Sequence, residues 1–175
     1  MNYYGLFGKE SKMMGIAYVP EGTPLFLLPD TGWIDNWQPM VMELREGGFV
    51  DYLANNRAWK LFSPKLKDIL ENSKGDRDAI QWLPVIVRSE DGEERDYFIM
   101  HIYEEHDVLD KDKTIYGNSN FIIKPVISQR LAAKHHIFAF IRAGGIRYCF
   151  SERVRKKVLA GKCTGVTFEP YAVVN

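Results

Sequence analysis

The chain has 175 residues, and its 23 Lys and Arg balance its 23 Asp and Glu, so the formal net charge is zero. Hydrophobic residues at 46% and charged residues at 26% are typical of a globular protein with a buried core, and they exclude a disordered chain, a collagen and a coiled coil. The charge balance also removes the strong basic field of a generic nucleic-acid binder, so nucleic acid is not an expected partner.

Short apolar runs closed by turn residues predict strands in the first third of the chain. These strands are expected at 16–19, 25–28 and 40–44. A helix over about 64–72 follows, because Ser63 is a good N-cap and Pro64 occupies the first helical position, where its missing N–H costs nothing. Leu66, Ile69 and Leu70 then lie on one helical face.

Two hairpins are predicted in the second half of the chain. Their strands are expected at 83–88 with 95–103, and at 137–142 with 146–150. Asp91-Gly92 is a typical tight turn for the first hairpin, and Ala143-Gly144-Gly145 separates the strands of the second. Between the hairpins, the run 121–127 predicts a strand near a sheet edge, because Pro125 cannot donate a hydrogen bond to a ladder.

The C-terminal region predicts a short helix that Ser151 begins and Gly161 ends. Its apolar positions are Val154, Val158 and Leu159. A last strand over 164–168 leads to Pro170.

This order of elements predicts an α+β fold, mainly of antiparallel hairpins with two or three short helices, because hairpins mix with helices without a βαβ rhythm. A single domain over 1–175 is expected. The alternative is two lobes, an N-terminal lobe over 1–75 and a hairpin-rich lobe over 76–175.

The N-terminus lacks a basic region followed by an apolar stretch, and no apolar run approaches the ~20 residues that span a bilayer. Cys149 and Cys163 are too few for a disulfide framework. We expect both thiols to be reduced, although a bridge between them stays open. These features predict a cytoplasmic protein with no membrane partner.

Metal sites are not predicted. His101 and His106 lie five positions apart, whereas a helical zinc pair needs histidines at i and i+4. A calcium loop starting at Asp110 would need Gly and Glu where the chain has Ile115 and Phe121. No metal and no cofactor is therefore assigned.

An enzymatic alternative rests on Asp30-Thr31-Gly32, which matches the aspartic-protease signature. Such enzymes use two carboxylates that share a proton, and the chain has no second copy of the motif. Asp30 would therefore act only in a dimer, as a dimeric aspartic-type hydrolase. A plain turn beginning at Pro29 explains the same residues. We assign no catalytic residue.

Two charged surfaces are candidates for binding. Between residues 104 and 113, five acidic residues and two lysines give an excess of three negative charges. Such a segment could dock a basic protein, and the alternative is a solvated surface loop. The acidic positions are Glu104, Glu105, Asp107, Asp110 and Asp112. Basic residues on the C-terminal helix suit phosphate contacts in a nucleic-acid-binding module, or a solvated helix face. These are Arg153, Arg155, Lys156, Lys157 and Lys162.

Four blocks of sequence make the chain resemble the immunity protein 11 family of bacterial polymorphic-toxin systems, formerly a domain of unknown function. The blocks are WQP at 37–39 with FVDYL at 49–53, FSPKLKDILE at 62–71 with QWLPV at 81–85, YFIM at 97–100 with DVLD at 107–110, and IF at 137–138 with CFSE at 149–152 and GVTFEP at 165–170. Their order and spacing agree over about residues 37–170.

This resemblance implies a non-enzymatic protein that is made beside a toxin gene. It would bind the cognate protein toxin and block or distort the active site of the toxin. The family supplies no catalytic residues. The acidic positions between Glu104 and Asp112 are the expected toxin-binding surface, because they suit a basic toxin.

Overall fold

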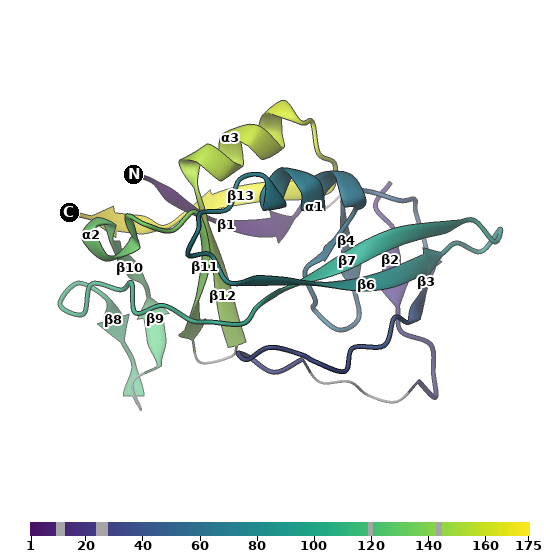
Figure 1. Cartoon of the computed structure of the whole chain (residues 1–175), viewed down its shortest axis with the longest axis horizontal. Helices are drawn as coiled ribbons and strands as arrows, with labels where there is room; N and C mark the ends of the chain where they lie inside the picture. The colour runs from purple at the N-terminus through teal and green to yellow at the C-terminus, as the bar shows by residue number, and fades with distance from the viewer. Residues whose placement is uncertain (10–12, 24–27, 119–120, 143–144) are drawn as a thin grey trace.

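The computed structural model describes residues 1–9, 13–23, 28–118, 121–142 and 145–175. Within these residues the strands are β1 Tyr3–Gly8, β2 Ile16–Tyr18, β3 Val41–Arg45, β4 Tyr52–Asn55, β5 Leu61–Phe62, β6 Ile80–Arg88, β7 Glu94–Ile102, β8 Ile115–Tyr116, β9 Ile122–Lys124, β10 Val126–Ser128, β11 Ile137–Arg142, β12 Gly145–Ser151, β13 Val166–Pro170 and β14 Ala172–Val174. The helices are α1 Pro64–Glu71, α2 Gln129–Ala132 and α3 Glu152–Ala160. Figure 1 shows their arrangement.

Six strands close into a barrel in the order β2-β3-β6-β7-β5-β4. Two neighbouring pairs in this barrel are parallel, β3 with β6 and β2 with β4, while the others are antiparallel. Alternate residues of β6 fill the interior, because Leu83, Val85 and Val87 are all buried there. The barrel therefore has its own apolar centre.

A second sheet lies beside the barrel, with the order β11-β12-β1-β13 and antiparallel pairing throughout. Strand β1, from the start of the chain, lies between β12 and β13 from its end. Two smaller units complete the structure, the parallel pair β10–β14 and the antiparallel pair β8–β9.

Helices α1 and α3 lie side by side over the barrel and the second sheet (Figure 1). The predicted cap of α1 is confirmed, because the Ser63 hydroxyl accepts a hydrogen bond from the Leu66 N–H at 3.2 Å. α3 also begins after Ser151, but no side-chain cap bond forms. The Ser151 Oγ lies instead 3.0 Å from His136 Nδ1.

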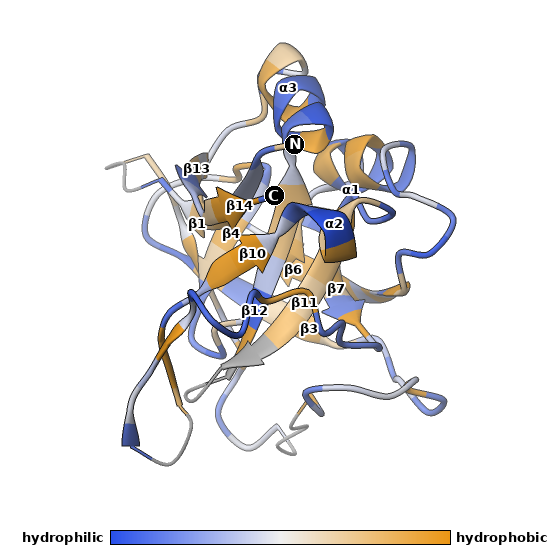
Figure 2. Ribbon diagram, turned by 90° about the vertical axis from the view of Figure 1, so that its left-hand side faces the viewer, coloured by the Kyte–Doolittle hydropathy of each residue, from blue (hydrophilic) through white to orange (hydrophobic). Residues whose placement is uncertain are grey.

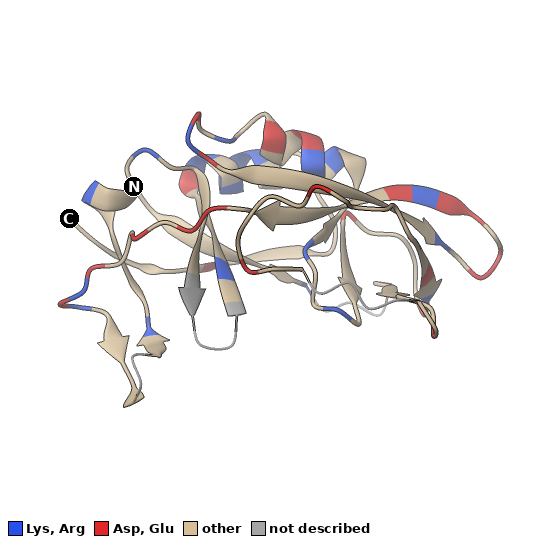
Figure 3. Cartoon of the chain, turned by 60° about the horizontal axis from the view of Figure 1, so that its bottom comes forward, with Lys and Arg blue, Asp and Glu red and all other residues tan. Residues whose placement is uncertain are grey.

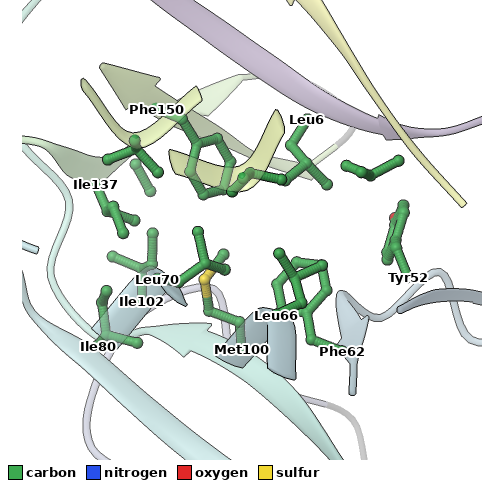
Figure 4. Close-up of a cluster of buried hydrophobic side chains, with 14 residues drawn as sticks. Leu6, Tyr52, Phe62, Leu66, Leu70, Ile80, Met100, Ile102, Ile137 and Phe150 are labelled. Carbon is green, nitrogen blue, oxygen red and sulfur yellow. The ribbon is translucent and has the colours of Figure 1, made fainter. Parts of the chain in front are cut away.

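One hydrophobic cluster is shared by the barrel, the second sheet and both long helices (Figure 4). Phe62 and Met100 come from the barrel, Leu66 from α1 and Phe150 from the second sheet, and all four are buried. Strand pairs such as β3–β6 and β1–β12 also join residues on both sides of position 75. On this basis we propose one domain rather than two lobes.

The α+β class agrees with the structure at a coarse level, and both predicted hairpins are present as β6–β7 and β11–β12. The prediction of mainly antiparallel hairpins is too narrow, because two parallel strand pairs are needed to close the barrel. Figure 2 shows β6, β7 and β10 as mainly hydrophobic and α3 as mainly hydrophilic. No helix within the described residues is both long enough and apolar enough to cross a membrane.

Some predicted elements differ in detail. The run 121–127 splits into β9 and β10 at Pro125, which has no N–H to continue a ladder. The last strand begins two residues later than expected, at Val166. Leu159 is not on the buried face of α3, because 49% of its surface is exposed. In the run 25–28, only Leu28 belongs to the described residues, and it lies outside any strand.

Candidate functional site

The acidic segment, residues 104–112, follows β7 and runs along the rest of the protein with its backbone held at several points. The His106 N–H donates to the Ala139 carbonyl at 3.0 Å. Further along, the Asp110 N–H donates to the Val126 carbonyl at 2.8 Å, and the Ser128 N–H donates to the Val108 carbonyl at 2.8 Å. These bonds hold the backbone of the segment along a defined path.

The apolar residues of the acidic segment are buried while most of its acidic side chains face solvent. Val108 and Leu109 belong to a hydrophobic cluster that also contains Tyr3, Phe138 and Cys149. Glu104, Glu105, Asp107 and Asp112 are exposed, and Asp110 is half-buried. Figure 3 shows acidic residues spaced along this part of the chain. The structure thus exposes four of the five acidic residues that were singled out in the sequence, and it leaves Asp110 half-buried.

Two of these acidic residues already have partners. The Asp107 carboxylate forms an exposed ion pair with Lys111 at 2.9 Å. Asp110 accepts a hydrogen bond from the Lys113 N–H at 2.9 Å, which closes a turn. Within the described residues, no ion pair engages Glu104, Glu105 or Asp112. These three carboxylates are therefore the ones available to an external cation.

His106 lies within the acidic segment and contacts the interior. Its ring stacks on that of His135, with 4.1 Å between the centroids. Burial, and then repulsion from His135, lowers the pKa of His106. The Nδ1 of His135 in turn lies 3.3 Å from Oδ1 of Asp78, whose side chain is fully buried. The rings of His106 and His135 thus connect the acidic segment with the buried carboxylate of Asp78.

The arm, which is the antiparallel pair β8–β9 together with the described residues between the two strands, follows the acidic segment and projects at one end of the molecule (Figure 1). It carries several large apolar side chains with substantial exposure. These are Ile115 at 52%, Tyr116 at 39%, Phe121 at 40% and Ile123 at 48%. Its base is fixed by the buried Thr114, whose hydroxyl accepts a hydrogen bond from the Val126 N–H at 3.1 Å and donates to the Val126 carbonyl at 3.3 Å.

Sequence reasoning missed the arm. It predicted one strand over 121–127 and did not pair that run with Ile115 and Tyr116. The available signal was an apolar pair on each side of the turn-forming stretch 117–120. Exposure of these apolar residues had no signal in the sequence, because apolar residues in short strands are normally buried.

Two of the basic residues of α3, Arg155 and Lys157, are engaged within the protein. The Arg155 guanidinium forms an ion pair with Glu152 at 3.2 Å and lies 4.9 Å from the centroid of the Tyr4 ring. The Lys157 Nζ donates to the Asn72 carbonyl at 3.0 Å. These contacts favour a solvated helix face over the phosphate-binding alternative.

The other candidates from the sequence are scattered. Asp30 lies exposed in a bend rather than within a strand. Cys149 and Cys163 are free thiols, and burial raises the pKa of Cys149. His101 is buried, with Nε2 at 2.7 Å from the Gly32 carbonyl oxygen. Across the described part of the chain, no three His, Cys, Asp or Glu side chains form a group suited to a metal ion.

Comparison with known families gives one clear result. A model of the Immunity protein family (Imm11) matches residues 20–173, which is nearly the whole chain. The comparison with curated proteins gives no match. The family match extends beyond the four blocks recognised in the sequence, and it includes both the acidic segment and the arm. The chain therefore belongs to the immunity protein 11 family.

Proposed function

We propose that the protein neutralises a cognate bacterial toxin by binding over the toxin active site with the acidic segment and the arm. Membership of an immunity protein family carries this proposal, since that membership indicates a toxin-neutralising role without enzymatic activity.

The arm supplies side chains of the kind that dominate binding energy in protein interfaces. Tyr116 and Phe121 are both large and exposed. Tyr116 pairs with Ile122, the residue next to Phe121, and the Gly117 N–H donates to the Phe121 carbonyl at 2.8 Å. Aromatic side chains are enriched among the residues that contribute most when an interface forms. A two-stranded hairpin is only marginally stable on its own in water, so coverage by a partner also stabilises the arm itself.

The acidic segment supplies charge for a basic partner. Its negative charges lie immediately before the arm in the chain, so one partner can contact both features. Charge complementarity of this kind mainly accelerates association and selects the partner, while buried aromatic contacts slow dissociation. A toxin domain with a basic rim around its active site fits this division of roles.

The test is a binding measurement with the toxin domain encoded beside the gene of this protein. We expect Tyr116→Ala with Phe121→Ala to weaken binding by roughly 30-fold or more, which corresponds to about 2 kcal/mol at a hot spot. We expect Glu104→Lys with Glu105→Lys to slow association and to reduce its dependence on salt. Glu90→Lys is the control, because Glu90 is an exposed acid in the β6–β7 turn, at the opposite end of the molecule in Figure 1.

Occlusion makes a separate prediction about toxin kinetics. A protein that covers the active site competes with the substrate, so a high substrate concentration should relieve inhibition. Inhibition that stays constant as substrate rises would instead indicate distortion of the toxin. The proposed surface would be refuted if Glu90→Lys weakened toxin binding as much as the Glu104 and Glu105 variant did, while the Tyr116 and Phe121 variant kept its full affinity.

A further inference from the structure

A cavity of about 380 Å³ lies between the barrel and the second sheet, away from the acidic segment and the arm. The connection between β4 and β5 and the strand β12 both contribute lining residues. Its lining residues include Arg57, Trp59, Lys60, His101, Arg147 and Tyr148. This volume is in the range of sites that hold small organic molecules.

Lys60 contributes a poorly solvated ammonium to this cavity. Its Nζ lies 3.2 Å from the Tyr52 hydroxyl and 3.4 Å from the Leu6 carbonyl oxygen, and 5.5 Å from the centroid of the Tyr52 ring. Burial, and then repulsion from Arg147, lowers the pKa of Lys60 to about 8. Within the described residues, no carboxylate forms an ion pair with Lys60.

Arg147 is the second cation in the cavity, and it too has no carboxylate partner among the described residues. Its Nε atom is buried and makes no hydrogen bond to the described part of the chain. Such an orphaned donor is uncommon, because buried polar atoms are normally paired. A charged donor left without an acceptor in this way loses its hydration without compensation.

The other charged residues of the cavity do not neutralise Lys60 and Arg147. Arg57 is a third cation in the wall, while Asp30 is the one carboxylate among the described lining residues. Asp30 is exposed, and no ion pair within the described residues connects it to a cation of the cavity. The wall therefore holds three cations against one carboxylate.

We propose that this cavity binds a small organic anion through a carboxylate or phosphate group placed between Lys60 and Arg147. The Arg147 guanidinium donates hydrogen bonds to two anion oxygens, which is the geometry for which arginine is suited, and Lys60 adds a point charge. Trp59 and Tyr148 provide apolar walls for the remainder of the ligand. This proposal goes beyond toxin binding and does not depend on it.

The experiment titrates the whole protein with inorganic phosphate and, separately, with acetate, at an ionic strength held constant with sodium chloride. Binding is followed by the thermal unfolding midpoint and by NMR signals of the arginine and lysine side chains. We expect a saturable shift with at least one anion. Arg147→Gln should weaken that binding at least tenfold, whereas Arg130→Gln should leave it unchanged, because Arg130 is an exposed arginine of α2 outside the cavity.

The two anions separate the ligand classes, since a response to phosphate alone indicates a phosphorylated ligand and a response to acetate alone indicates a carboxylate. Shifts that never saturate, or that are equal in the two arginine variants, would overturn the proposal. If Arg147→Gln does not fold, Lys60→Gln with the same control gives the same decision, because Lys60 is the other cation placed against the anion. In the free protein, Arg147→Gln should also raise the pKa of Lys60, because the repulsion between the two cations is removed.

Discussion

Removal of the Asp78 carboxylate should strongly destabilise the protein where the chain enters the second sheet. The Asp78 side chain has no exposed surface, and its oxygens accept hydrogen bonds from three backbone N–H groups. The donors are Gly75 at 2.6 Å, His136 at 3.1 Å and Ile137 at 2.8 Å. Asp78 therefore connects the turn after α1 with the start of β11.

The magnitude follows from those three donors. In Asp78→Ala, each donor left unsatisfied costs about 1 to 3 kcal/mol. Gly75 and His136 are half-buried, so water can reach them in part, whereas Ile137 is fully buried. We expect a total loss of about 3 to 4 kcal/mol, a large share of the roughly 5 to 15 kcal/mol that stabilises a typical domain.

Urea unfolding followed by tryptophan fluorescence measures this loss. Asp76→Ala is the matched control, because Asp76 is an exposed aspartate two positions away, and it should change the free energy of unfolding by less than about 0.5 kcal/mol. Asp78→Asn should fall between the two, since it keeps one oxygen acceptor and loses the charge. A loss below about 1 kcal/mol in Asp78→Ala would refute the assigned role of these hydrogen bonds.

Three further outcomes are expected from unfolding measurements. Leu66→Ala should lower the free energy of unfolding by about 2 to 5 kcal/mol, because Leu66 is fully buried. Leu159→Ala should change it little, because Leu159 is 49% exposed, and similar values for the two variants would contradict the packing of α1. Ser63→Ala should remove the cap bond to Leu66 and cost about 1 to 2 kcal/mol, and an unchanged stability would show that the cap is dispensable. Because the pKa of His106 is lowered in the folded state, the unfolded chain takes up the proton first as pH falls through about 6.5, so stability should decrease below that pH. In His106→Asn this decrease should become smaller, and an identical pH profile would exclude His106 as its source.

Sequence reasoning located the elements that depend on neighbouring residues. The helix α1 was predicted from Ser63 and Pro64, and its observed bounds differ from the prediction by one residue. The β6–β7 hairpin was predicted from Asp91-Gly92, and Gly92 adopts a φ of +89°, which glycine tolerates better than other residues. Such signals succeed because the capping atom or the turn residue lies within a few positions of the backbone that it controls.

Sequence reasoning identified one of the two parts of the candidate site. The acidic segment was identified from its charge, and the structure shows that its carboxylates are displayed on a fixed backbone. The arm was not identified, because the exposure of Ile115 and Phe121 depends on what other parts of the chain leave uncovered. The toxin-binding role of both features stays a prediction until the binding measurement is made.

The sequence by itself determined a charge-balanced chain, the capped helix α1, its two hairpins and its family resemblance. Tertiary structure alone decided that β2 and β4 close the barrel as a parallel pair, and that β1 lies between β12 and β13. It also placed Lys60 and Arg147 in one cavity. The physical reason is that these contacts join residues far apart in the chain, where the shape of the shared core, and no local backbone preference, selects the partner.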